Sequence, residues 1–124
     1  MATEAALEGL YVGADQTVTM TVYQSDGETP QNIAGWTILL DIRKRDTSSD
    51  PALLSVTGTV SGVYNVDPNT NTQVVTFTLT DDNLAASIFP GDDWTGRYSI
   101  KRTTAGSEMP LRFGDVTVTR VTQA

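Results

Sequence analysis

The chain contains no cysteine and no histidine. The first absence excludes disulfide bonds and thiolate nucleophiles, the second excludes imidazole bases, and together they remove the usual zinc ligands. The common catalytic triads cannot be assembled, so any catalysis would have to use carboxylates, lysine, tyrosine or hydroxyl groups. We therefore expect no enzyme, no bound metal and no cofactor.

Long apolar runs are also missing. The longest span only a few residues, such as Ile38-Leu39-Leu40, whereas a helix that crosses a bilayer needs ~20 apolar residues. The first residues lack the basic and apolar regions of a secretory signal. The sequence therefore predicts a protein that is made in a cytoplasm and has no membrane partner. Its 124 residues fit one domain, because ~100–150 residues is the commonest domain size.

Basic residues are missing from the first third of the chain. Residues 1–42 contain six acidic residues and no lysine or arginine, whereas residues 43–124 contain all eight basic residues and nine acidic ones. Nucleic-acid binding needs a clustered basic face, so neither this distribution nor the net charge of −7 favours it. The acidic third is either solvated surface or a face that docks on a basic partner.

Threonine, by contrast, is abundant, with 20 copies in 124 residues. It alternates with apolar residues over 17–22, 75–80 and 116–119. Successive side chains of a strand point to opposite faces, so this pattern places an apolar row inside and a hydroxyl row outside. Threonine suits the outer row because its β-branched side chain is stiff and packs well on a pleated surface. The pattern predicts an all-β fold.

Turn residues divide the chain into seven to nine short strands at roughly ten-residue spacing, which is typical of an antiparallel two-sheet sandwich. One short helix is expected over 81–89, because Thr80 or Asp81 can cap it and Pro90-Gly91 can end it. Gly114 is expected to mark a bulge. The predicted strands cover 16–24, 36–44, 53–60, 63–66, 73–80, 96–103, 109–113 and 115–121.

In three long strands the residues expected to point inward are apolar, which predicts one core. Ile33, in a polar loop, is expected to be buried in the same core. Residues 1–10 are predicted to form an N-terminal arm, in which residues 5–8 could make a helical turn, and residues 11–124 the domain itself. Leu7 and Leu10 are too few to stabilise such an arm, which should be disordered or folded onto a neighbour. The core prediction comprises Trp36, Ile38, Leu40, Ile42, Phe77, Leu79, Tyr98 and Ile100.

Several strand and turn spellings follow one another in a familiar order: Asp15-Gln16-Thr17, Asp26-Gly27, Ile33-Ala34-Gly35-Trp36-Thr37, Ile42-Arg43-Lys44, Thr78-Leu79-Thr80-Asp81-Asp82, Gly96-Arg97-Tyr98-Ser99-Ile100 and Gly114-Asp115-Val116-Thr117-Val118. This order resembles the immunoglobulin-like β-sandwich domains of tailed-bacteriophage virion proteins, such as the N-terminal domain of baseplate upper proteins. The resemblance covers about 15–121 and implies a structural part that holds other proteins in place. The chain departs from the long baseplate proteins by ending without a fibre or receptor-binding domain, which leaves direct host recognition unsupported.

The resemblance implies a non-enzymatic structural protein of a tailed phage particle, in the tail, adaptor or baseplate. It would be assembled into the virion in the host cytoplasm, and its partners would be other virion proteins and copies of itself, with no nucleic acid or small-molecule substrate. A capsid decoration or head-fibre protein is the alternative. A carbohydrate- or cell-surface-binding module is third, because its candidate aromatic residues lie on different segments: Tyr11, Tyr23, Tyr64 and Trp94.

Two acidic pairs, Asp81/Asp82 and Asp92/Asp93, are the candidates for metal binding or acid–base work. Neither has the spacing of a calcium loop, and nothing places two carboxylates across a cleft as a glycosidase requires. They are interpreted as a helix-start charge pair and a solvated loop.

Trp94 lies in a predicted loop, 91–96, where a large aromatic residue has no automatic place in the core. Tryptophan is over-represented among interface anchors, although the ring could instead fold over the open end of the sandwich. We expect the arm and this loop to dock on neighbouring subunits. The predicted interface residues are Leu7, Leu10, Asp92, Asp93 and Trp94.

Overall fold

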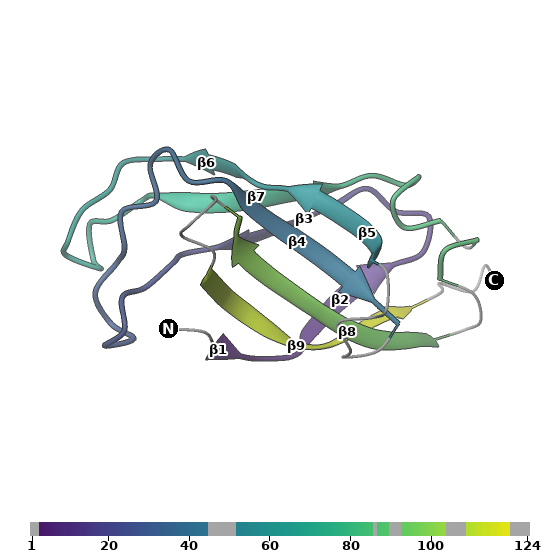
Figure 1. Cartoon of the computed structure of the whole chain (residues 1–124). Helices are drawn as coiled ribbons and strands as arrows, with labels where there is room; N and C mark the ends of the chain where they lie inside the picture. Colours follow the sequence, from purple (N-terminus) through teal and green to yellow (C-terminus); the bar gives the residue numbers. More distant parts are fainter. Residues whose placement is uncertain (1–2, 45–51, 86, 90–92, 104–108, 120–124) are drawn as a thin grey trace.

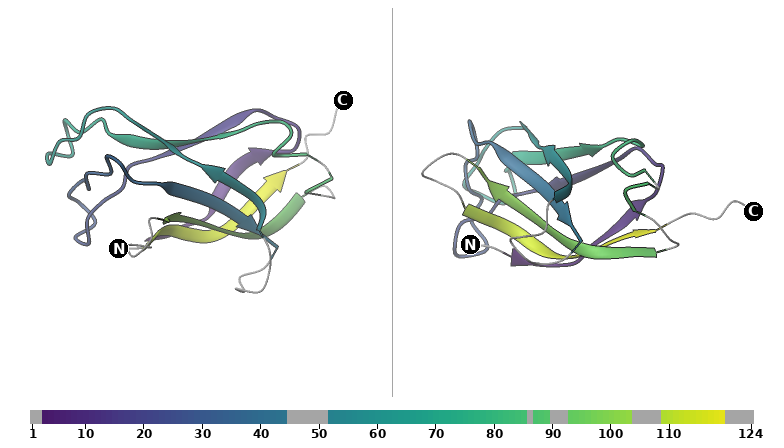
Figure 2. Two further views of the ribbon diagram at one scale, coloured as in Figure 1. Left: turned by 45° about the horizontal axis from the view of Figure 1, so that its top comes forward. Right: turned by 45° about the vertical axis from the view of Figure 1, so that its right-hand side comes forward.

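The computed structural model describes residues 3–44, 52–85, 87–89, 93–103 and 109–119. Within these residues the chain forms nine strands and no helix, so the all-β prediction is confirmed. The strands make two sheets that lie over one another as two layers, with the apolar side chains between them (Figure 1, Figure 2).

The expected helix over 81–89 is wrong for the described part of that segment, which forms isolated turns. Leu84 N–H donates to the Thr80 carbonyl at 3.1 Å, and Phe89 N–H donates to the Ala85 carbonyl at 3.1 Å. Leu84 and Phe89 are both fully buried. A regular helix would turn these two residues about 140° apart, so it could not direct both into one core.

The larger sheet is mostly antiparallel. Its strand order is β1-β9-β8-β4-β5, and β2 pairs with the same edge of β9 as β1 does. β1 and β2 run parallel to β9, which the prediction of a wholly antiparallel sandwich did not include. The strands are β1 (Thr3–Glu4), β2 (Leu7–Tyr11), β4 (Ile38–Arg43), β5 (Ala52–Thr57), β8 (Asp93–Arg102) and β9 (Met109–Thr119).

The smaller sheet is antiparallel in the order β3-β7-β6. Gly58 alone separates β5 from β6, so the chain passes from one sheet to the other there and the predicted strand 53–60 is split. A Cβ atom at Gly58 would overlap the Val75 and Phe77 side chains, which explains the glycine at this crossing. The strands are β3 (Gln16–Met20), β6 (Thr59–Ser61) and β7 (Val74–Leu79).

Residues 63–66 are not a strand, contrary to prediction. They belong to a loop that continues to β7, and Val63 is 74% exposed and Val66 62% exposed. Side-chain hydrogen bonds order this loop, including a 3.0 Å bond from Asn65 N–H to Asn71 Oδ1. The polar side chains therefore satisfy the backbone in place of a strand partner.

The threonine rows of the smaller sheet lie on its outer face, as predicted. Thr17 is opposite Thr78, and Thr19 is opposite Thr76, with the last two hydroxyl oxygens 3.3 Å apart. The apolar residues that alternate with them point inward and are buried. They are Val18, Val75, Phe77 and Leu79.

The predicted core is confirmed except at its first member. Trp36 precedes β4 and is partly buried, with the guanidinium of Arg102 stacked 4.1 Å above its ring. Ile33 is buried, and its N–H donates to Oε1 of buried Gln73 at 3.0 Å. The buried core predictions are Ile38, Leu40, Ile42, Phe77, Leu79, Tyr98 and Ile100.

The N-terminal segment belongs to the sheet. Leu7 and Leu10 are opposite Val116 and Val118 of β9 and are buried in the core. The expectation that these leucines lack a partner within the domain is therefore wrong, as is the helical turn over 5–8. Residues 5 and 6 join β1 to β2, and residues 7 and 8 lie in β2.

Gly114 does not mark the bulge that was expected of it. It pairs regularly with Tyr98, and the register shift of β9 lies at Leu111, between Pro110 and Arg112. A Cβ atom at Gly114 would overlap the Ala5 carbonyl, so the glycine allows the N-terminal segment to approach β9 closely.

Candidate functional site

The structure does not gather the predicted interface residues into one site. Leu7 is 7% exposed and Leu10 is 2% exposed, so neither side chain is available as an anchor on a neighbour. Asp92 lies outside the described residues. Asp93 begins β8, where its backbone is paired with Thr119. A docking role for the aspartates stays a prediction.

Trp94 is in a strand and not in the predicted loop. Its backbone is paired with Val118, and its ring meets that of Phe89 edge to face, with centroids 4.8 Å apart. A Cβ atom at Gly96 would overlap the Trp94 ring, so the glycine makes room for it. The partly buried ring fits the alternative interpretation, in which it covers the end of the sandwich. Its use as an interface anchor stays a prediction.

Four of the six acidic residues of the first third, those whose side chains the structure describes, do not share one face. Asp15 precedes β3, whereas Asp26 and Glu28 follow this strand in the next loop. Asp41 is buried, accepts a 2.6 Å hydrogen bond from the Ser55 hydroxyl and lies 3.6 Å from Lys101 Nζ. Asp15, Asp26 and Glu28 therefore flank the two ends of β3, while Asp41 is already paired inside the domain.

The aromatic candidates for carbohydrate binding are partly brought together. Tyr23 forms an isolated β-bridge with Pro30, and the Tyr64 hydroxyl donates to the Pro30 carbonyl at 3.0 Å. Tyr11 ends β2, and Trp94 lies on β8. Tyr23 is 43% exposed while Tyr64 is partly buried, so this pair does not present two open rings.

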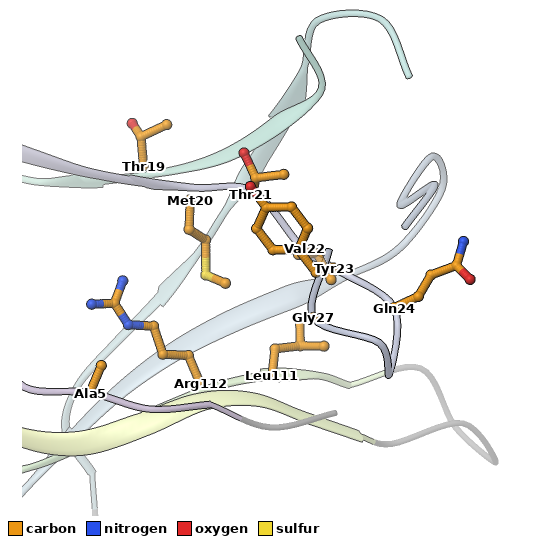
Figure 3. A pocket seen from close by; sticks show the side chains of 10 residues that line it. All are labelled: Ala5, Thr19, Met20, Thr21, Val22, Tyr23, Gln24, Gly27, Leu111 and Arg112. Carbon is orange, nitrogen blue, oxygen red and sulfur yellow. The ribbon is translucent and has the colours of Figure 1, made fainter. Parts of the chain in front are cut away.

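A cavity of about 450 Å³ opens between the two sheets beside β3 (Figure 3). Met20 points into it from β3, and Arg112 points into it from β9 on the opposite side. Thr19 and Thr21 point away from it. The residues around the cavity are Ala5, Thr19, Met20, Thr21, Val22, Tyr23, Gln24, Gly27, Leu111 and Arg112.

Arg112 is the charged residue among those that line this cavity, and it was not singled out from the sequence. It is partly buried, its guanidinium carbon is 6.0 Å from the centre of the Tyr98 ring, and none of the described acidic residues forms an ion pair with it. The sequence does contain a signal for it: Arg112 lies on the same alternating row of its strand as buried Gly114, Val116 and Val118, which point inward. A charged residue on an inward row indicates a polar site.

Tyr98 is expected to make folding sensitive to alkaline pH. Its hydroxyl donates to the Ala5 carbonyl at 2.6 Å, and burial raises the pKa of this phenol while the Arg112 cation lowers it in part. Because the folded pKa exceeds the unfolded value of about 10, the stability that this group contributes is complete below pH about 10 and falls as pH rises further.

Urea titrations of the parent and of Tyr98→Phe, at pH about 8 and pH about 11, measure this effect. We expect the parent to lose more unfolding free energy than the variant over this interval. Equal losses would show that Tyr98 does not carry the dependence.

The described residues contain no cluster of three or more histidine, cysteine, aspartate or glutamate side chains that could hold a metal ion. In the same part of the chain, no helix has the length and apolar character needed to cross a membrane. No family model matches the chain, and no curated protein matches it.

Proposed function

We propose that the chain is an immunoglobulin-like sandwich that acts as a non-enzymatic structural protein of a tailed phage particle, in its tail, adaptor or baseplate. The single observation in the structure that supports the immunoglobulin-like fold is the strand order, whereas the virion role rests on the sequence resemblance. An immunoglobulin sandwich places strands B, E and D in one sheet and C, F and G in the other, with C′ added in the variable type. The order β3-β7-β6 corresponds to B-E-D, and β9-β8-β4-β5 corresponds to G-F-C-C′.

Several of the sequence segments that resemble phage domains lie in or next to these same strands. The resemblance and the strand order therefore support the same fold. The turn at Asp15 leads into β3, Ile42-Arg43-Lys44 ends β4, and Gly96 to Ile100 lies in β8. The chain departs from antibody domains in lacking the cysteine pair that joins strands B and F. Buried side chains of β3 and β8, such as Val18 and Tyr98, contribute to one core without a disulfide.

Quantitative mass spectrometry of purified particles, and of separated tails and capsids, tests the proposal. We expect the protein in the tail fraction at a fixed ratio to the other tail proteins. Its presence on capsids alone would favour the decoration or head-fibre alternative. Its absence from purified particles would contradict a virion role.

A further inference from the structure

We propose that the free edge of β3 and the cavity beside it form a docking groove for one extended segment of another protein, which adds to the smaller sheet as a further strand. The segment has apolar side chains and one carboxylate on its inner face, and basic residues at its ends. This inference rests on the assembly role proposed above and names the surface and the partner chemistry for it.

The edge of β3 is open to pairing. Among the described strands, β7 is the sole partner of β3, so alternate backbone groups of β3 point toward no other strand. Natural edges are usually protected by charges, proline or bulges, and residues 16–20 contain none of these. Strand addition uses such an edge for affinity and takes its specificity from pockets for alternate side chains.

One end of this edge is already closed. Gln16 Oε1 accepts a 2.6 Å hydrogen bond from Tyr11 N–H, and Gln16 Nε2 donates to the Gly9 carbonyl at 2.6 Å. These bonds fasten β3 to the end of β2. The open run therefore begins after Gln16 and reaches Met20 beside the cavity, because the Val22 carbonyl beyond it already accepts a hydrogen bond from Gln31 N–H at 2.8 Å.

The cavity matches the inner face of an added strand. Met20 comes from β3 and buried Val22 from the segment just after it, while Ala5 and buried Leu111 come from the opposite side (Figure 3). Its volume of about 450 Å³ is within the range of sites that bind a ligand of several side chains' size. An apolar side chain placed there would extend the existing core, which is what makes strand addition favourable.

Charge selects the occupant. Arg112 directs its guanidinium into the cavity and has no ion-pair partner among the described acidic residues, so a carboxylate on the inner face suits it. Asp15 lies before β3, and Asp26 and Glu28 lie after it, so basic residues suit the two ends of the segment. Two hydrogen bonds from Thr29 and one from Glu28 N–H lower the pKa of Asp26 and keep it ionised.

The same charges argue against a second copy of this chain. An antiparallel pair of β3 edges would bring Asp15 of one copy toward Asp26 and Glu28 of the other. Like charges at both ends oppose that arrangement, and the net charge of −7 adds to the repulsion. The groove therefore fits a different protein.

The probe for this groove is the peptide acetyl-Lys-Thr-Leu-Thr-Glu-Thr-Leu-Lys-amide, which places Leu, Glu and Leu on one face when extended. It is titrated into the isotope-labelled full chain, with chemical shifts and amide hydrogen exchange as readouts. We expect shifts at residues 17–22 and 111–112, and slower exchange of the β3 amides that do not face β7. A peptide of the same composition with its leucines and threonines scrambled is the control ligand.

Two variants locate the binding. Arg112→Met is expected to weaken binding roughly tenfold or more, because a charge-assisted hydrogen bond is lost. Lys44→Met removes the same charge from an exposed position away from the cavity and should leave the affinity unchanged. Met20→Trp, which fills the cavity while keeping an apolar side chain, should also weaken binding.

Shifts confined to the loop 62–73, or equal binding of the scrambled peptide, would overturn the groove. So would concentration-dependent dimerisation through β3 without peptide, since the occupant would then be a second copy. These outcomes are separable from the particle experiment. A protein found in tails that does not bind the probe contradicts the groove alone, and one that binds the probe but is missing from particles contradicts the virion role alone.

Discussion

Replacement of Phe77 by alanine is expected to lower the free energy of unfolding by about 3–5 kcal/mol. Phe77 is fully buried in β7, is paired with Val18 across the smaller sheet, and packs where Gly58 lacks a side chain. Removing the ring deletes apolar contacts and leaves a cavity that the surrounding strands can close only in part. Denaturant titration of parent and variant measures the difference.

The matched control for this substitution is Thr78→Ala, on the same strand but exposed on the outer face. Its effect should stay within about 0.5 kcal/mol, as for most surface changes. A loss below about 1 kcal/mol in Phe77→Ala would contradict the assignment of this residue to the core.

Leu10→Ala is expected to cost about 2–5 kcal/mol in unfolding free energy. Leu10 is 2% exposed and is opposite Val118, so its side chain is part of the same core as that of Phe77. An arm that docks on a neighbouring subunit would instead make this substitution silent in the isolated protein. Denaturant titration of the isolated chain therefore distinguishes the two arrangements.

Tyr11→Ala is the control, because Tyr11 follows in the same strand and is 41% exposed. If Leu10→Ala does not fold, Leu10→Val provides a smaller truncation, with an expected cost of about 0.5–1.5 kcal/mol by analogy with other single-methylene deletions. An effect of Leu10→Val no larger than that of Tyr11→Ala would contradict the burial of this leucine.

The strands that the sequence predicted well share a simple physical basis. Where threonine and apolar residues alternate, one face must be buried, and a shift by one residue would expose the whole apolar row. This constraint determined the inward residues of β3 and β7 from the alternation in their sequences alone. Trp36 was the exception among the predicted core residues, because it precedes β4 and is partly buried under Arg102.

Strand pairings between residues that are distant in the sequence could not be predicted from alternation. Leu7 and Leu10 are three residues apart, so they fit no strict two-residue alternation. They reach the same core because the register shifts between them, where Gly9 has a φ of 82°. Nothing in residues 1–10 specifies a strand more than 100 residues later as their partner.

The candidate site was hidden by two local signals. Glycines on both sides of Trp94 suggested a loop, but Gly96 is a strand residue whose Cβ position is occupied by the Trp94 ring and the Arg43 backbone. Arg112 follows Leu111 at the bulge, which places two adjacent side chains beside the same cavity. Alternation predicts the inward direction of Arg112, but it does not predict that Leu111 beside it faces the same cavity.

The parallel pairing of β2 with β9 has a mechanical consequence. β2 lies near the start of the described chain and β9 at its end, so tension applied along the chain pulls these two strands in opposite directions along their length. The hydrogen bonds between parallel strands then bear the load together, whereas those of a hairpin pulled from its open end break one after another. Stretching force is therefore resisted most strongly at the seam between residues 7–11 and 116–119.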